Sequence, residues 1–417
     1  MKTTSIVLFA TTSALFAGTP PNLTPPPSTD GDWIKPLVDI RTRYEFADID
    51  RSDVSHAWTF RERLGLQTIA WNGFSALVEG EFSQAAVDDY NGGAPLANPF
   101  DPRNSLIADP ETNELNQAYL QYAGFDTTAR IGRQRIVYDN SAFIGDVGWR
   151  QNQQTFDSIS VTNKSLDGLI VNYAYLNQIN RIFGSDADAP LAPGFANVED
   201  IASSSHLFNA SYTGIKGLTL GGYAYIMNFE DVGAWDNNTF GLSAKGDLQG
   251  ISLYGELAWQ DKAGLRGTSD ATYVHVNATK KFASAAFDFG SLTLGMEHLD
   301  AGFKTPLATV HLFNGFSDVT DAARISGAHN GLTNLYLAHT IPVFFGMKWT
   351  NVFHTMGDNE ISTGYGWEYD SVLTKKFDDH FTAIAKFAIF NSEGDGYVGA
   401  APLPDATRFS VELNYVF

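Results

Sequence analysis

Apolar and polar residues alternate along many segments of the chain, and the last segment shows this most clearly. Residues 409–417 read F-S-V-E-L-N-Y-V-F. Because successive side chains of a β-strand point to opposite sides, the aromatic and aliphatic residues share one face, and Ser410, Glu412 and Asn414 share the other. The recurrence of such segments predicts a protein built from two-faced strands.

About eighteen segments carry this pattern, and each is roughly the ten residues long that a tilted membrane strand needs. The predicted strands are Val38–Phe46, Trp58–Leu66, Phe74–Phe82, Leu115–Ala123, Thr128–Tyr138, Phe156–Val161, Leu169–Tyr175, His206–Tyr212, Leu218–Met227, Thr239–Gly246, Ile251–Trp259, Tyr273–Thr279, Leu292–His298, Leu332–Ile341, Met347–Thr355, Tyr365–Lys375, Phe381–Phe390 and Phe409–Phe417. An even number of strands is typical of single-chain bacterial barrels.

The connections between these segments alternate between short and long. Short turns at one mouth and long loops at the other are typical of outer-membrane barrels. We therefore predict an all-β fold, a transmembrane antiparallel β-barrel of about 18 strands with periplasmic N- and C-termini. The loops Ser83–Asn113 and Asp300–Gly331 are long enough to fold into the lumen. Phe282–Ser291 is longer than a short turn should be.

Soluble all-β folds are the alternatives to a barrel. A propeller or solenoid needs a motif at a fixed period, which the sequence lacks. A sandwich fits poorly because the strands are too many for one core and the loops are not uniformly short.

The N-terminal region predicts export. Residues 1–18 combine Lys2, a short apolar run and small residues at Ala17 and Gly18, as in a signal peptide. Residues 19–34 are rich in proline and predict an extended periplasmic lead-in, so the barrel is expected to occupy 35–417. Beyond residue 30, no apolar run reaches the ~18 residues of a membrane helix, and a closed barrel is the other way to cross.

Composition and motifs exclude several functions. The formal net charge of −20 argues against nucleic acid as a partner, and the absence of cysteine excludes disulfides and thiolate metal sites. Motifs for metalloproteases, phosphate-binding loops and serine hydrolases are missing. The stretch from Gly394 to Gly399 matches G-x-G-x-x-G but lacks the helix that the motif requires. We expect no enzymatic activity, no catalytic or metal-binding residues and no cofactor.

The inward faces of the first strands are highly charged. An arginine facing lipid at mid-bilayer costs ~2–4 kcal/mol, so these side chains should line an interior. Arginine also suits planar, bidentate contact with carboxylate or phosphate. The candidate pore-lining residues on these faces are Arg41, Arg43, Glu45, Arg61, Arg63, Glu79, Glu81, Arg130, Arg133, Gln134 and Arg135.

One candidate strand conflicts with strict alternation. If Arg130 and Gln134 face the lumen, then Arg133 and Arg135 face lipid. We therefore predict a β-bulge at or near Gly132 that turns the later arginines inward.

The charges of the inner wall allow two interpretations. Arginines and carboxylates on neighbouring strands could form cross-strand ion pairs that stiffen the wall. They could also form a narrow, net-positive constriction that selects anions, because low-dielectric walls focus the field of a charged ring. The aspartates of the long loops match no metal-binding spacing, and we interpret them as solvated surface charge.

The segment from Arg41 to Asp157 resembles the alginate-export family of outer-membrane porins. The resemblance rests on R-x-R-x-E at Arg41, R-x-R at Arg61, and a specific run from Gly132 to Asp157. That run contains Gly132-Arg133-Gln134, Asp139-Asn140, Phe143-Ile144-Gly145, Trp149-Arg150-Gln151-Asn152 and Phe156-Asp157. The family implies an eighteen-stranded monomeric barrel that passes an anionic polysaccharide or another solute passively. It also implies pore-lining roles for Arg41, Arg43, Arg61, Arg63, Arg133 and Arg150.

The expected function is therefore that of an integral, multi-pass porin in the bacterial outer membrane. Its expected partners are outer-membrane lipid and lipopolysaccharide, together with small or polymeric solutes such as anionic sugars. The alternative is a plugged structural or adhesive barrel whose extracellular loops bind partners. Liposome swelling with graded sugars distinguishes the two.

Overall fold

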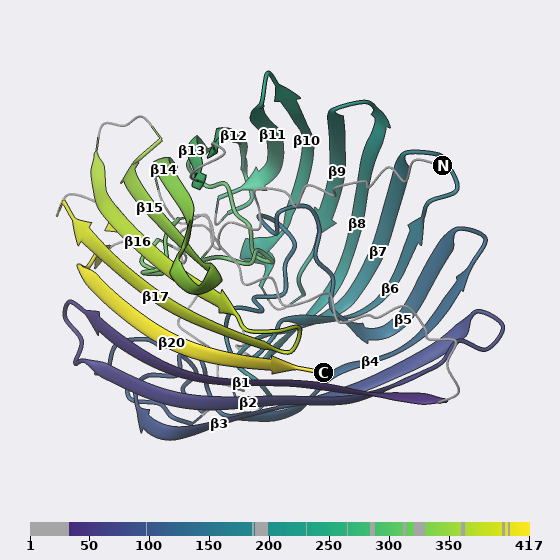
Figure 1. Cartoon of the computed structure of the whole chain (residues 1–417), viewed down its shortest axis with the longest axis horizontal. Helices are drawn as coiled ribbons and strands as arrows, with labels where there is room; N and C mark the ends of the chain where they lie inside the picture. Colours follow the sequence, from purple (N-terminus) through teal and green to yellow (C-terminus); the bar gives the residue numbers. More distant parts are fainter. Residues whose placement is uncertain are drawn as a thin grey trace.

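The chain folds into a closed antiparallel barrel of 18 strands (Figure 1). A computed structural model describes residues 33–417 apart from 97, 186, 188–198, 231, 265, 284–287, 312–313, 321–329, 360–362, 394–396 and 399–400. The barrel closes because β1 pairs with both β2 and β20. The predicted signal peptide and nearly all of the proline-rich lead-in lie outside the described residues.

Each of the eighteen predicted segments overlaps a barrel strand, although the predicted Thr128–Tyr138 runs past the end of β5 at Gln134. The strands are β1 (Ile34–Ile49), β2 (Ser55–Thr68), β3 (Phe74–Asp89), β4 (Thr112–Gly124), β5 (Thr127–Gln134), β6 (Thr155–Asn163), β7 (Leu169–Asn180), β8 (Asp200–Ile215), β9 (Leu218–Met227), β10 (Asn237–Leu248), β11 (Ile251–Ala263), β12 (Ser269–Ala283), β13 (Asp288–Leu299), β14 (Leu332–Val343), β15 (Met347–Gly357), β16 (Gly364–Lys376), β17 (Phe381–Ser392) and β20 (Ala406–Val416). The long connection expected at 282–291 is mostly strand, since β12 continues to Ala283 and β13 begins at Asp288.

The remaining described elements are short. β18 (Tyr397–Val398) pairs with β19 (Ala401–Pro402) outside the barrel sheet. Two 3-10 turns, η2 (Gly233–Trp235) and η3 (Phe344–Gly346), sit in connections between strands. Within the described residues, no helix has the length and apolar character needed to cross a membrane.

Alternation along the strands separates an apolar outer surface from a polar interior. On β2, Arg61 and Arg63 are almost completely buried, whereas Leu64 is 48% exposed. On β20, Val411 and Leu413 face outward and Glu412 between them is buried. The closed ladder pairs the backbone groups of each strand with its neighbours, which allows the wall to lie in lipid.

The two mouths of the barrel differ. At one mouth the turns are tight, as at Phe125 and Asp126 between β4 and β5. The start of β1 and the C-terminal residue lie at this short-turn mouth, where Phe417 donates its backbone N–H to Val38 O at 2.8 Å. The opposite mouth carries the β3–β4, β5–β6 and β13–β14 loops, residues 90–111, 135–154 and 300–331.

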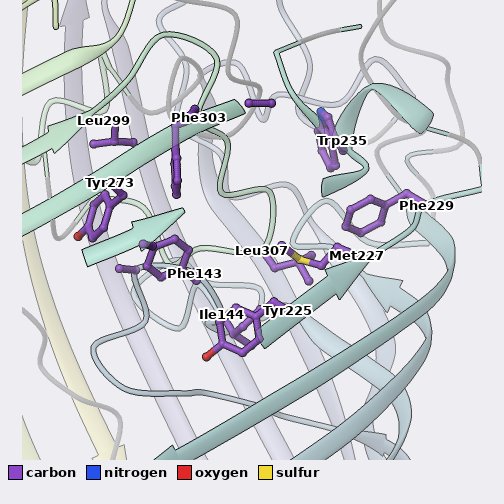
Figure 2. Packing of buried hydrophobic residues seen from close by; sticks show 14 of the residues in the cluster. Phe143, Ile144, Tyr225, Met227, Phe229, Trp235, Tyr273, Leu299, Phe303 and Leu307 are labelled. Carbon is purple, nitrogen blue, oxygen red and sulfur yellow. The ribbon is translucent and has the colours of Figure 1, made fainter. Parts of the chain in front are cut away.

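Two of these long loops fold inward and pack against the far wall. Phe143 of the β5–β6 loop lies 5.2 Å from the ring of Tyr223 on β9 and 5.1 Å from that of Tyr273 on β12. Phe303 of the β13–β14 loop joins the same cluster, and Figure 2 shows the rings of Phe143, Tyr273 and Phe303 close together. The described part of the loop Asp300–Gly331 therefore folds inward, as predicted.

The two loops also pair with each other through their backbones. Gly145 donates its N–H to Leu307 O at 2.8 Å, and Thr309 donates to Ser141 O at 3.0 Å. A Cβ on Gly145 would lie 2.0 Å from the hydroxyl oxygen of Thr309, so this approach requires glycine. The paired loops therefore behave as one structural unit inside the barrel.

Candidate functional site

The inner faces of β1 and β2 form a wall of arginines and carboxylates. Arg41 lies directly opposite Arg61 in the register, and Asp39 lies opposite Arg63. Like charges facing each other across a strand pair are destabilising by themselves. Acidic side chains must therefore separate the guanidinium groups for the wall to be stable.

Carboxylates of β1 and β3 supply this separation. Asp39 accepts a hydrogen bond from Arg61 and lies 3.6 Å from Arg63 Nη1. Glu81 on β3 accepts from Arg63 Nε. These side chains all lie on the inner side of the wall, and arginines pair with carboxylates of neighbouring strands there.

Glu79 is held by amides instead of arginine. The register between β3 and β4 shifts at this point, which places both Asn116 and Gln117 on the inner side. Asn116 donates to Glu79 Oε1 at 2.8 Å and Gln117 donates to the same oxygen at 3.0 Å. A bulge on β4 therefore supplies two donors where regular alternation would supply one.

The arginines of β1 also hold the β5–β6 loop. Arg41 donates from Nη1 to Arg150 O at 2.9 Å and from Nη2 to Gly148 O at 3.2 Å. Arg43 donates to Trp149 O at 2.6 Å. Because a guanidinium presents several donors in one plane, two arginines can fix three consecutive carbonyl groups. Residues 148–150 are thereby fastened to β1 inside the barrel.

Arg150 connects this loop to two other parts of the chain. Its Nη1 lies 3.0 Å from Glu45 Oε2 on β1, and its Nη2 donates to Asp318 Oδ2 of the β13–β14 loop at 2.8 Å. Asp109 of the β3–β4 loop accepts from Arg43 and lies 3.5 Å from Arg150. Three long loops thus meet at one buried guanidinium.

The loop carboxylates are ionised in this setting. Burial by itself raises the pKa of Asp109, but the nearby guanidinium groups of Arg43 and Arg150 outweigh it, and the pKa lies below its ordinary value. The pKa of Asp318 is lowered in the same sense: burial opposes the shift, and His311 and Arg150 bring it about. Replacing Asp109 or Asp318 by a neutral residue would leave the arginine that it faces buried with one counter-charge fewer.

His311 lies in a stack of rings between the two inward loops. Its ring is 3.6 Å from that of Trp149 and 4.4 Å from that of Phe316, nearly parallel to both. Its Nδ1 donates to Asp318 at 2.7 Å, and Nε2 lies 3.5 Å from Lys386 Nζ. Burial lowers the pKa of His311 to about 3. A neutral imidazole donating to Asp318 fits all these contacts.

The wall of β13 and β16 holds the β13–β14 loop from the other side. Glu297 accepts from Asn314 at 3.0 Å, and Asp370 accepts from the N–H of Phe316 at 3.3 Å. Glu368 accepts from the N–H of Ser317 at 2.7 Å. The segment 314–318 is therefore held between an acidic wall and the arginine wall.

Cationic and acidic side chains alternate in this region, which we call the central cluster. Its members are Arg41, Arg43, Arg61, Arg63, Arg135, Arg150, Lys386 and Arg408 with Asp39, Glu45, Glu79, Glu81, Asp109, Asp146, Asp318 and Glu412. A cavity of about 20 Å³ lies between Arg43, Trp149, His311, Lys386 and Arg408, and it has room for about one water molecule. The cluster is packed, and the acidic side chains Glu297, Glu368 and Asp370 lie beside it.

The remaining predicted site residues lie apart from each other. Arg130 faces inward, donates to Gln121 at 2.7 Å and lies over the ring of Tyr119. Gln134 also faces inward, and it accepts from Ser160. Both lie on the inner wall, away from the loop contacts described above.

The predicted bulge at Gly132 is wrong. β5 pairs with β4 and β6 without a register shift, so Arg133 stays on the outer side opposite Asp157, to which it donates at 2.7 Å. Asp157 therefore neutralises the positive charge of Arg133 on the outer side of the barrel. Arg135 does reach the interior, because β5 ends at Gln134 and the chain then turns to bring its side chain to Asp146.

Several members of the central cluster were not among the predicted site residues. Arg408 and Glu412 lie on the polar face of β20, so alternation alone could have indicated them. Lys386 shares the inner face of β17 with the apolar Ile384 and Ala388, which do not mark that face as polar. Asp109, His311 and Asp318 lie in loops, where no periodic pattern marks the inward side chains. Among the described residues, no group of His, Asp and Glu is arranged to hold a metal ion.

Comparison with known proteins agrees with this geometry. The family model described as "Alginate export" matches residues 37–286, more than half of the chain. A search of curated proteins found no match.

Solved structures share the fold at low sequence identity. OccAB4 of Acinetobacter baumannii has a TM-score of 0.68 at 12% identity, covering 93% of this chain and 98% of that one. OccK8 (OprE) of Pseudomonas aeruginosa has a TM-score of 0.66 at 12% identity, covering 92% and 98%. OccK11 (OpdR) of the same organism has a TM-score of 0.63 at 15% identity, covering 92% and 96%.

Proposed function

Because the chain belongs to the alginate export family, we propose that its barrel is a passive aqueous channel with an arginine-rich constriction for anionic or carbohydrate solutes. The protein is an integral, porin-like barrel of the bacterial outer membrane. The proposed role is transport without catalysis or a cofactor, by a single chain. We further propose that the short-turn mouth and both termini face the periplasm and that the long-loop mouth meets lipopolysaccharide.

One observation supports the constriction above the others: Arg41, Arg43 and Arg150 hold loop segments in the middle of the lumen. The interior of an 18-stranded barrel is wide enough for water. Loop segments held inside the lumen narrow the water-filled passage that is left for a solute. Arginines at such a position can donate to hydroxyl groups and carboxylates of a passing solute.

The charge balance of the central cluster bears on selectivity. Carboxylates lie between the cations of the cluster, and Glu297, Glu368 and Asp370 line the wall beside it, so we expect no strong positive field here. A solute carboxylate would instead gain by taking the place of a loop carboxylate, such as Asp318 on Arg150. We therefore propose a modest preference for anions that depends on exchange of partners.

Two measurements on the purified protein test this function. Reversal potentials in planar bilayers under a salt gradient should show a modest anion preference, and a cation-selective potential contradicts it. Swelling of liposomes in sugars of increasing size should show entry of small sugars and a size limit. Liposomes without protein, prepared in the same detergent, serve as the control.

A second candidate is the plugged barrel whose extracellular loops bind partners. The packing of Phe143 and Phe303 against the far wall favours it, because this contact closes part of the lumen with apolar side chains. In that case liposomes would not swell with any sugar, although the protein would insert. A swelling assay thus separates the two candidates.

A further inference from the structure

Arg181 differs from the arginines of the central cluster. It follows the last residue of β7, at the long-loop mouth, and its backbone N–H donates to Glu199 O at 3.0 Å. Its guanidinium has neither a hydrogen-bond acceptor nor a carboxylate partner within the described part of the chain. Cluster arginines such as Arg61 and Arg150 bind carboxylates. Arg181 therefore presents a set of unused donors.

Two aromatic rings set the position of this guanidinium. Its central carbon lies 5.2 Å from the ring centre of Phe183 and 5.2 Å from that of Trp235. Cation–π contacts of this length stabilise the charge without occupying the N–H groups. The donors at the edge of the guanidinium thus remain available to an incoming group.

Trp235 is itself rigidly held. It is 2% exposed, and its ring meets that of Phe229 edge-on at 6.1 Å, as Figure 2 shows. Lys304 donates to the carbonyl of the preceding residue, Ala234, at 2.7 Å. The aromatic platform under Arg181 is therefore fixed by the β13–β14 loop.

The indole of Trp235 adds a second unused donor. Its Nε1–H is buried and has no acceptor among the described residues. A buried donor without an acceptor costs stability, so its presence beside a second unpaired donor calls for an explanation. Neither the guanidinium of Arg181 nor the indole N–H of Trp235 has an acceptor among the described residues, and an oxyanion could accept from both.

The charge on Arg181 persists under ordinary conditions. Burial lowers the pKa of Arg181 to about 10, which leaves the guanidinium protonated at neutral pH. A partly desolvated cation attracts an anion more strongly than one in bulk water, because the effective dielectric constant is lower.

We propose that Arg181 and the indole N–H of Trp235 form a binding site for the carboxylate of a small solute at the long-loop mouth. This inference rests on the proposed function, for which the site would be the first contact of an anionic solute. A carboxylate fits because its two oxygens can accept from the planar guanidinium and the indole together.

The site is connected to the constriction. Asn152 of the β5–β6 loop donates from Nδ2 to Ile182 O at 2.9 Å, next to Arg181 in the chain. Arg150 lies two residues before Asn152 and belongs to the central cluster. A solute bound at Arg181 is thus held beside the loop that crosses the lumen.

Titration calorimetry on the detergent-solubilised barrel tests the site with D-glucuronate as the carboxylate probe and D-glucose as its uncharged counterpart. We expect wild type to bind glucuronate in preference to glucose. R181Q should weaken glucuronate binding at least about tenfold, and W235F, which removes the indole donor and keeps a smaller aromatic ring under Arg181, about threefold. R103Q is the matched control, because Arg103 is an exposed loop arginine that already pairs with Asp101.

Glucuronate affinities within about twofold of wild type in both R181Q and W235F would overturn the proposal. Inorganic phosphate bound about tenfold more tightly than glucuronate, with the difference lost in R181Q, would also overturn it, because the site would then serve phosphate groups such as those of lipid headgroups. Calorimetry needs no ion flux. Binding without conductance therefore counts against the proposed function alone, and conductance without binding counts against this site alone.

Discussion

Arg150 donates a hydrogen bond from Nη2 to Asp318 Oδ2 at 2.8 Å, joining two loops whose residues are 168 positions apart in the chain. The contact is buried and lies between the β1 wall and the ring stack of Trp149, His311 and Phe316. If the loops narrow the channel, this contact holds the narrowing segment in place. The predictions below follow from its physical chemistry.

Replacing Asp318 by alanine should widen the passage. The substitution removes the acceptor for Arg150 Nη2 and His311 and loosens the 314–318 segment on the side of the arginine wall, while Glu297, Glu368 and Asp370 still hold it on the other side. We expect a single-channel conductance about twofold higher or more, because the segment can then move toward the wall of β13 and β16. D101A, which breaks an exposed pair with Arg103, is the control and should leave conductance unchanged. Equal conductance of D318A and wild type would contradict this role.

The pair of Arg61 and Asp39 should contribute to stability mainly as a unit. R61M removes the hydrogen-bonded partner of the buried Asp39 and leaves Arg63 at 3.6 Å as its ion-pair partner, and it should cost about 3–5 kcal/mol of unfolding free energy. Adding D39N should restore about 1–3 kcal/mol, because the uncompensated charge disappears. Urea unfolding in lipid vesicles, followed by tryptophan fluorescence, measures both. Additive losses in the double variant would show that the two side chains do not interact.

Acidification should loosen the β13–β14 loop. The packed His311 has a pKa of about 3, against 6.5 for a free histidine. Between pH 6.5 and pH 3, His311 binds a proton when the loop is released but not when it is packed. The free energy that favours the packed loop therefore decreases as the pH falls below 6.5, by at most about 1.4 kcal/mol per pH unit. Asp318 acts later: its lowered pKa adds stability above the ordinary value of 3.8, and this is lost as the pH falls further.

The measurement for this prediction is channel conductance between pH 7.5 and pH 5. Conductance of wild type should rise on acidification. His311→Gln removes the titrating group and should flatten the curve between pH 6.5 and 5. The groups that contact His311 in this range, Asp318 and Lys386, remain in the variant. An unchanged pH dependence in H311Q would assign the effect to another group.

Gly315 should not tolerate a side chain. It has a φ of +93°, and a Cβ there would lie 2.2 Å from the carboxyl carbon of Glu368. G315A should therefore push the loop from β16 and increase its cleavage by protease in the folded barrel. Gly255, where a Cβ meets nothing within 4 Å, offers the matched control, and G255A should be cleaved like wild type. Wild-type resistance in G315A would show that the loop is held elsewhere.

Sequence alone predicted the wall of the barrel well. Because β1, β2 and β3 each bury one face, polar and apolar side chains alternate strictly along them. The inward positions of Arg41, Arg61 and Glu79 could therefore be predicted from the sequence. The same rule applied to β20 would also have indicated Arg408 and Glu412. The alternation of polar and apolar residues was sufficient to place side chains where the strand backbone is regular.

The alternation of polar and apolar residues did not predict the inward side chains of the loops or the outward position of Arg133. Arg133 was expected inside because a lone arginine in lipid is costly, but Asp157 on the next strand pairs with it on the outer side. Cross-strand partners depend on register, which a single strand does not reveal. Asp109 and Asp318 reach the cluster through loops of irregular backbone, and their positions depend on tertiary contacts with Arg43 and Arg150.

Single-channel recording in planar bilayers tests the account most directly, with wild type and D318A measured side by side in symmetric potassium chloride. The account predicts discrete current steps for wild type and larger steps for D318A. Insertion of both proteins without current steps would contradict it, because a barrel that stays closed after loss of the Asp318 contact is a plug and not a channel.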